Sequence, residues 1–524
     1  MGRLFDFLLS TVVLPALLGA TIVICGCSDG MNFRATRSDL GLSRTNIVLV
    51  SLDTLRADRL HCYGNPRETS PRIDELARDG VLFTNAFAVS PWTLPSHLSL
   101  FTSQYPGRFF RGISGLDDEP EIDHPIAFRL EPDDPSLALY LEDNGYDTVG
   151  FHGGAFVAKE FGFDSGFRRY ESSRLSFRKA IQYLETEAPS EHPFFMFVHT
   201  YAAHRPYAYE DVFGGRGLRP AGLEAFEPRR DTINGARLTP LDPTEPLYGW
   251  TANAEQRDYF LTVYDGGVHQ VDRLLGELVD ALKERDLYEQ TLIIVLSDHG
   301  EEFWEHIPEG SPEHNHSLFD ELLRVPLIIK LPNASHAGSR IDALVGLTDV
   351  LPTVLDAVGI EPEDRAPVGV SLLNVMDDPE KRAPERELYV GYTFLGPMRY
   401  GLRTERYKYI HAPATRSFTP HFLVPEQALY DLESDPLELR NLALANPEVT
   451  EEMHARLTAY REKDIPYRLD LSESGMGKRN REGLGDLGMQ RFVEKILLAE
   501  RSTEPMTEAD AETLERLRSL GYVD

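Results

Sequence analysis

The chain has little cysteine and comparatively little positive charge. It contains three cysteines in 524 residues, and two of them, Cys25 and Cys27, lie close to the N-terminus. Removal or modification of that end leaves Cys62 as the one thiol, so we expect no disulfide in the folded domain. Lysine and arginine number 53 against 84 aspartates and glutamates, a formal net charge of −31. Nucleic-acid binding needs stripes of basic side chains and the chain has no such stripe, so we expect no nucleic-acid partner.

Long apolar runs are scarce too, apart from Leu8 to Ile24. This run follows Arg3 and ends with small residues before Cys27, which is typical of an export signal over residues 1–27. The pattern resembles the bacterial lipoprotein signal. It implies a lipid on Cys27 that contacts the membrane, with the protein exported to the periplasmic side or the outer membrane. An uncleaved membrane anchor and a plain signal peptide are the alternatives.

A length of 524 residues predicts one large domain and a smaller one. Residues 28–44 are polar and form a tether in this interpretation. The large domain covers residues 45–380, and a small C-terminal α+β subdomain covers residues 381–465. The remaining residues, 466–524, are expected to form a loop and a C-terminal helix.

Short apolar runs of strand length predict strands that are buried on both faces. They are Asn46–Ser51, Pro193–Val198, Thr291–Leu296 and Val325–Lys330. Helical patterns lie between them, at residues 70–79 and around 268–282. Strands that alternate with helices predict an α/β fold with a large, mostly parallel sheet between layers of helices. Three further short runs, at residues 387–392, 398–403 and 407–411, predict a small antiparallel sheet.

Polar side chains follow the predicted buried strands. Asp53 follows the first strand, His199 and His204 the second, and Asp298-His299 the third. The carboxyl ends of parallel strands meet at one edge of a sheet, so we expect these groups to converge there. Two aspartates, one histidine and a hydroxyl oxygen suit a divalent metal. Taken singly, an Asp after a strand is more often a turn former and a lone His more often a core residue.

The segment Ser90–His97 places Thr93 at the start of a predicted helix. A hydroxyl there faces unpaired backbone N–H groups and a partial positive charge, which suits a nucleophile that attacks an anionic phosphorus or sulfur centre. The alternative is that Thr93 or Ser96 only caps the helix.

Several segments of the chain resemble the sulfatases of the alkaline phosphatase superfamily, in the order in which that family has them. They are Asn46–Gly64, Ser90–Pro106, Leu296–Glu302, Phe319–Ile328, Ala428–Leu442 and Leu517–Val523. The resemblance implies the alkaline phosphatase-like fold. It also implies hydrolysis of an anionic sulfate, phosphate or phosphonate ester, on a substrate such as a glycan or a lipid head group.

The same resemblance implies roles for individual residues. Asp53, Asp298 and His299 would bind a metal that also contacts Thr93. His204 would contact the substrate. A histidine against the leaving group is expected at His316, with His314 as the alternative.

The chain departs from the sulfatase pattern at three positions. Thr93 stands where sulfatases have the Cys or Ser that becomes formylglycine, His97 where they have Arg, and Thr54 where many have a second Asp. We therefore expect no formylglycine. Fewer carboxylates and a histidine ligand favour zinc or manganese, with calcium as a third candidate.

A threonine at the nucleophile position changes the expected chemistry. A formylglycine hydrate expels sulfate by collapsing to an aldehyde, but a threonine ester has to be attacked by water. That attack needs a hydroxide made by a second metal or a general base, for which His204, His314 and His316 are candidates. Two other functions are open. One is a non-catalytic sulfatase-fold lipoprotein that acts as a surface binding module. The other is a phospholipid head-group transferase, which the single apolar segment disfavours.

Overall fold

A computed structural model describes most of the chain between residues 45 and 464. The described residues are 45–109, 128–205, 207–209, 211–213, 220, 226–231, 235–240, 252–306, 313–362, 366–377, 386–394, 398–412 and 425–464. The predicted export signal, the tether and the C-terminal helix lie outside them. None of the helices in the described ranges is long and apolar enough to cross a membrane.

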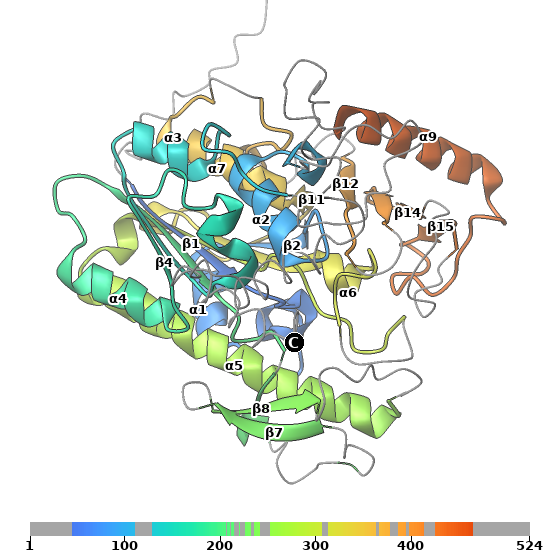
Figure 1. Ribbon diagram of the computed structural model, residues 1–524, viewed down its shortest axis with the longest axis horizontal. Helices are drawn as coiled ribbons and strands as arrows, with labels where there is room; N and C mark the ends of the chain where they lie inside the picture. Colours follow the sequence, from blue (N-terminus) through green and yellow to red (C-terminus); the bar gives the residue numbers. More distant parts are fainter. Residues whose placement is uncertain are drawn as a thin grey trace, which may run out of the picture.

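A sheet of eight strands forms the centre of the molecule (Figure 1). The strands are β1 (Asn46–Leu52), β2 (Val81–Phe87), β3 (Asp147–His152), β4 (Arg169–Ser172), β5 (Phe194–Thr200), β9 (Thr291–Leu296), β10 (Arg324–Lys330) and β11 (Ser339–Gly346). Their order across the sheet is β11-β2-β10-β9-β1-β5-β3-β4. Neighbours are parallel except at β10, which is antiparallel to both β9 and β2. The predicted mostly parallel sheet is confirmed.

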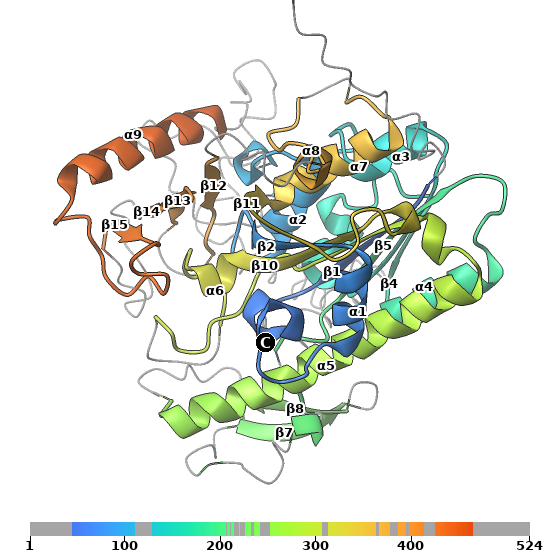
Figure 2. The same ribbon diagram turned by 180° about the vertical axis from the view of Figure 1, so that it is seen from behind.

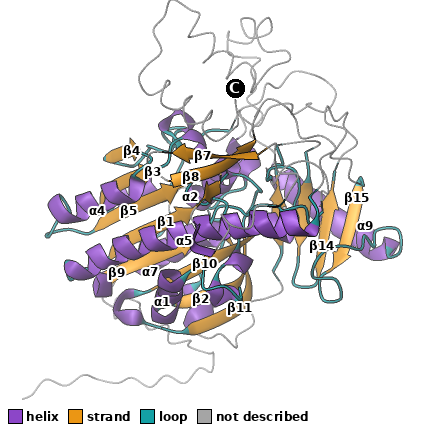
Figure 3. Cartoon of the chain, turned by 90° about the horizontal axis from the view of Figure 1, so that it is seen from below, coloured by secondary structure: helices purple, strands orange, loops and turns teal. Residues whose placement is uncertain are grey.

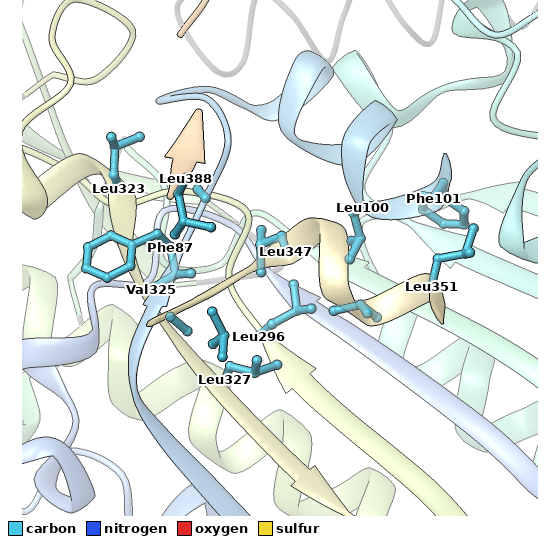
Figure 4. Close-up of a cluster of buried hydrophobic side chains, with 14 of the residues drawn as sticks. Phe87, Leu100, Phe101, Leu296, Leu323, Val325, Leu327, Leu347, Leu351 and Leu388 are labelled. Carbon is cyan, nitrogen blue, oxygen red and sulfur yellow. The ribbon is translucent and has the colours of Figure 1, made fainter. Parts of the chain in front are cut away.

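Helices cover both faces of the sheet (Figures 1 and 2). The apolar side chains of α1 (Pro71–Asp79), α4 (Ser176–Thr186) and α5 (Ala254–Glu284) pack on one face, with Val48 and Val50 of β1. Those of α2 (Thr93–Thr102), α3 (Leu137–Asp143), α7 (Val350–Val358) and α8 (Leu373–Asp377) pack on the other face, with Ile47 and Leu49. Figure 4 shows part of this second core, where Leu351 of α7 lies beside Phe101 of α2, and Leu296 of β9 lies beside Leu327 of β10. The fully buried β1 explains why its sequence is apolar without alternation.

The predicted helices are both present, and one is much longer than predicted. The pattern at residues 70–79 forms α1, which begins at Pro71. The pattern around 268–282 is the second half of α5, whose 31 residues begin after an Asn253–Gln256 capping box. Gly266 and Gly267 stand in the middle of α5, and such a pair interrupts the apolar repeat from which the helix was predicted.

A second sheet lies beside the large one (Figure 3). Its four antiparallel strands are β12 (Leu388–Gly391), β13 (Tyr400–Arg403), β14 (Tyr407–His411) and β15 (Gln427–Asp431), and α9 (Pro447–Asp464) packs on β13 and β14. The first three strands were predicted, and β15 was not. A third sheet joins β6 (Tyr207–Tyr209), β8 (Gly235–Pro240) and β7 (Phe226–Asp231). The predicted domain boundary at residue 380 lies outside the described residues.

Buried ion pairs join the second sheet to the main domain. Lys408 of β14 lies 2.7 Å from an oxygen of Asp320 and 2.8 Å from one of Glu438. Asp320 begins α6 (Asp320–Leu323), the short helix that leads into β10. Because a buried charge without its partner is costly, the Lys408–Asp320 pair holds the second sheet in one position against the main domain, and Glu438, which follows β15, helps to neutralise Lys408.

His306 makes a further link and supplies a test of stability against pH. Its Nδ1 lies 2.5 Å from Glu321, its Nε2 donates to the carbonyl of Leu437 at 3.1 Å, and its ring stacks on Phe319. Burial opposes the charge, but the hydrogen bond and charge of Glu321 outweigh it and raise the pKa of His306 to about 9. A folded-state pKa above the unfolded value near 6.5 means stabilisation that is present below pH 6.5 and lost as pH rises through 9.

We therefore expect the wild type to lose about 3 kcal/mol of unfolding free energy between pH 6 and pH 10 relative to His306→Gln. Urea unfolding of both proteins at the two pH values measures this difference. The control is His192→Gln, which removes an exposed histidine and should follow the wild type. If the unfolding free energies of the wild type and His306→Gln changed equally between the two pH values, the pKa of His306 would not be raised in the folded protein.

Candidate active site

The adjacent strands β5, β1 and β9 carry the polar residues of the site at one edge of the sheet. All three run in parallel, and Ser51 of β1 pairs with His199 on one side and Leu296 on the other. Asp53 follows β1, and Asp298 and His299 follow β9, so the shared register brings them together. The convergence expected at the carboxyl ends of the strands is what the fold produces.

Thr93 is the first residue of α2, and its side chain does not cap the helix. Trp92 holds the cap position without a side-chain cap hydrogen bond. The Thr93 hydroxyl instead donates to Oδ2 of Asp53 at 3.2 Å and lies 3.4 Å from Nε2 of His299. Ser96 donates to the carbonyl of Asp298 at 2.6 Å. Neither hydroxyl caps the helix, and the Thr93 side chain lies beside Asp53 and His299.

His97 holds the first turn of α2 in place. Its Nδ1–H donates to the carbonyl of Thr93 at 2.9 Å, so its Nε2 accepts the hydroxyl proton of Ser51 at 3.0 Å. Burial lowers the pKa of His97 although the nearby Asp298 acts in the opposite direction. The position at which sulfatases have an arginine is therefore a neutral, fully hydrogen-bonded histidine here. The sequence did not mark His97 as a site residue, although its spacing of four from Thr93 was a usable signal.

Asp53, Asp298 and His299 form a buried group that suits a metal ion. One oxygen of each carboxylate and Nε2 of His299 lie within 4.8 Å of one another. Nε2 is 3.5 Å from Asp298 Oδ2 and 3.9 Å from Asp53 Oδ1, and both of these buried oxygens lack a hydrogen-bond donor. Nδ1–H of His299 donates to the Gly300 carbonyl at 2.9 Å, so the Nε2 lone pair is left for a ligand.

The electrostatics of this group support the same conclusion. Burial, and then the neighbouring Asp298 carboxylate, raise the pKa of Asp53 well above its usual value. Two carboxylates that face each other without a donor are unstable as a buried pair of charges, and a divalent cation between them would remove that cost. The donor set therefore fits a metal.

Two other acidic and histidine-rich groups in the described residues do not offer free lone pairs in the same way. In the first, made by His97, His199 and Asp298, Nδ1 of His199 accepts the Gly153 N–H and its Nε2 donates to Asp53 at 3.3 Å. His97 is engaged at both nitrogens as described above. In the second, made by Glu302, His306 and Glu321, both nitrogens of His306 act as donors. These groups support the site or the fold rather than bind a cation.

The backbone is unusual at two residues next to the metal group, the name used here for Asp53, Asp298 and His299. Thr54 has φ of +57°, which is rare for a β-branched residue, and its hydroxyl donates to the Asp53 carbonyl at 2.7 Å. The side chain at the position of the missing second aspartate is thus turned to the backbone. At Gly300 a Cβ atom would lie 2.0 Å from the carbonyl oxygen of Glu321, so only glycine fits beside His299.

The remaining predicted histidines are buried, but only some of them lie beside the metal group. The ring of His314 lies 4.6 Å from that of His299 and 5.0 Å from that of His204. His316, the favoured candidate for the leaving group, has its Nε2 3.4 Å from Glu302. Burial lowers the pKa of all three predicted histidines well below the usual value. The structure therefore places the alternative candidate, His314, next to His299, and the roles of these histidines stay predictions.

The sulfatase family model matches residues 45–360 of the chain. The chain belongs to the sulfatase family. A second model, of the C-terminal part of N-sulphoglucosamine sulphohydrolase, matches residues 314–463. Enzymes of this family are ester hydrolases that depend on a metal, and Asp53, Asp298 and His299, the buried group that fits a metal, all lie within the matched residues.

Relatives and solved structures agree with this assignment. Arylsulfatase K of Gallus gallus is 25% identical over 461 residues, 78% of this chain and 81% of that protein. N-acetylglucosamine-6-O-sulfatase of Bacteroides thetaiotaomicron is 23% identical over 528 residues, 83% of this chain and 87% of that protein. The solved phosphonate monoester hydrolase of Agrobacterium radiobacter has a TM-score of 0.59 at 21% identity and covers 80% of this chain and 96% of its own. The similarity to this solved structure shows a shared fold.

Proposed function

We propose that the protein is a metal-dependent hydrolase of sulfate, phosphate or phosphonate esters with Thr93 as its nucleophile. The observation that carries the proposal is the place of the Thr93 hydroxyl. It lies at the N-terminus of α2, within 3.4 Å of both Asp53 and His299, beside two carboxylate oxygens that lack donors. A nucleophile, an anion-binding helix end and a cation site thus share one point in the fold.

In the first step the Thr93 oxygen attacks the sulfur or phosphorus atom in line, its hydroxyl proton passes to the Asp53 carboxylate, and the ester oxygen leaves. Asp53 accepts the hydrogen bond of the Thr93 hydroxyl and so orients the attacking lone pair. His97 holds the backbone of Thr93 by a hydrogen bond to its carbonyl, and Ser51 in turn donates to His97. A divalent cation held by Asp53, Asp298 and His299 would supply a lower hydroxyl pKa and neutralise the transferring group. The histidine and the small number of carboxylates favour zinc or manganese over calcium.

His204 and His314 complete the site in this proposal. Their rings lie side by side, and that of His314 also lies against His299. Contact with the anionic ester favours protonation of these otherwise neutral imidazoles, which lets them stabilise the transition state and protonate the leaving oxygen. The contact of His314 with His299 supports giving His314 the leaving-group position.

The proposal includes turnover without formylglycine. Thr93 has a β-branched side chain that cannot form the aldehyde hydrate on which sulfatases rely. The ester that forms on Thr93 has to be cleaved by water. Attack by water can cleave a sulfate ester and a phosphate ester alike. The substrate is therefore an anionic ester whose class is not set by the nucleophile.

A comparison of ester classes tests the proposed function. After reconstitution with zinc, manganese or calcium, we expect kcat for at least one of aryl sulfates, aryl phosphates and aryl phosphodiesters to exceed the first-order rate constant of its uncatalysed hydrolysis by roughly 10⁶-fold or more. Steady-state release of 4-nitrophenol from each class measures this. A metal-loaded protein without turnover on any of them would instead support the binding-module function.

A further inference from the structure

Two glutamate–histidine pairs lie side by side near the proposed site. In the first, Oε1 of Glu301 lies 2.9 Å from Nδ1 of His314, and neither side chain is exposed. In the second, Oε2 of Glu302 lies 3.4 Å from Nε2 of His316. The two glutamates are consecutive, yet their partners present opposite ring nitrogens to them.

In the first pair, Glu301 fixes which nitrogen of His314 carries the proton. A carboxylate accepts the Nδ1 proton, so the neutral ring carries its lone pair on Nε2 at the opposite edge. The rings of His299 and His204 lie 4.6 Å and 5.0 Å from the His314 ring and restrict its rotation. His314 is thus held in one tautomer and one orientation, next to the residue that lies 3.4 Å from the Thr93 hydroxyl.

We propose that Glu301 is a positioning residue that holds His314 as the general base for hydrolysis of the Thr93 ester. This inference rests on the proposed function. A water molecule gives a proton to Nε2 of His314 while its oxygen bonds to the sulfur or phosphorus atom. The bond from that atom to the Thr93 oxygen breaks, and the proton passes from His314 to this oxygen. The products are the regenerated Thr93 hydroxyl and the released anion, which is sulfate, phosphate or a monoester according to the substrate.

The proposal predicts that loss of Glu301 slows the second step more than the first. An aryl ester with a good leaving group needs little acid assistance to form the Thr93 ester, whereas the attack by water still needs the base. In Glu301→Ala we expect the steady-state rate to fall by about 10²- to 10³-fold. A rapid burst of about one 4-nitrophenol per active site should precede it, with the added group on Thr93 detected by mass spectrometry.

Three further proteins make the test specific. Glu301→Gln keeps an oxygen that accepts the Nδ1 proton and the volume of the side chain, so its steady-state rate should recover to within about tenfold of wild type. His314→Gln should show the burst of Glu301→Ala. Glu302→Ala is the matched control from the same loop and should not accumulate the Thr93 ester. Metal content and circular dichroism of each variant report whether the site and the fold are intact.

The outcomes separate this inference from the proposed function. A metal-loaded wild type without turnover defeats the proposed function and the inference with it. An active wild type with an unchanged Glu301→Ala, or with burst and steady state lost together in a folded, metal-loaded variant, overturns only the positioning role. Accumulation of the ester in Glu302→Ala but not in Glu301→Ala overturns it in favour of the second pair and His316.

Discussion

Replacement of Thr93 by alanine is expected to lower kcat by at least about 10⁴-fold, because it removes the atom that forms the covalent intermediate. The side chains of the proposed metal ligands are kept, since the Thr93 hydroxyl donates to Oδ2 of Asp53, whereas the oxygens without a donor are Oδ1 of Asp53 and Oδ2 of Asp298. Elemental analysis should therefore find the metal content of Thr93→Ala close to that of wild type. Thr93→Ser keeps a hydroxyl and should retain most of the activity.

The matched control for this prediction is Thr102→Ala at the other end of the same helix. The Thr102 hydroxyl donates to the carbonyl of Leu98 at 2.7 Å and contacts no residue of the site. Its loss should leave kcat within about threefold of wild type. Turnover at the wild-type rate in Thr93→Ala would show that the chain does not use this hydroxyl as its nucleophile.

Removal of the metal is expected to abolish turnover and to lower the thermal stability of the wild type. Without a cation, Asp53 and Asp298 face each other in a buried site, a state that costs free energy. A cation present at about 1,000 times its Kd stabilises the fold by about 4 kcal/mol, and a chelator removes this contribution. Calorimetry with and without chelator, together with elemental analysis, measures both effects.

Variants of the ligands connect these effects to the site. Asp298→Asn should bind less than a tenth of the wild-type metal, and chelator should no longer change its unfolding temperature, because there is no bound metal for the chelator to remove. Asp342→Asn, which alters an exposed carboxylate bonded to Thr84, is the control and should respond to chelator as the wild type does. An equal response of Asp298→Asn and wild type to chelator would exclude Asp298 as a ligand.

Much of the fold could be predicted from residue types because its strands are buried on both faces. The run at Thr291–Leu296 coincides with β9, since an unbroken apolar run of strand length is buried on both faces of a sheet. The short run at Tyr407–His411, which includes a lysine, also coincides with a strand, β14. The direction of β10 could not be predicted. The apolar pattern of a buried strand is the same whether it pairs parallel or antiparallel with its neighbour. Here the loop after β9 and the short α6 bring the chain back so that β10 runs antiparallel to β9.

The site divides in a similar way. Asp53, Asp298 and His299 were predicted because residues after parallel strands meet at one edge of the sheet. His97 and Glu301 were not predicted as site residues, since a single polar residue near an apolar run has no pattern of its own. Spacing also gave no means to choose between His314 and His316, which differ by two positions in a segment without regular structure.

By itself the sequence determined which side chains are available at the strand ends, and that the residue at the start of α2 is a threonine. Only the tertiary structure decided which atoms of these side chains can act. The tautomers of His97, His199 and His314 depend on Ser51, Gly153 and Glu301, which come from other segments of the chain. A hydrogen bond needs its two atoms within about 3 Å, and for residues far apart in sequence only the packed fold supplies that distance.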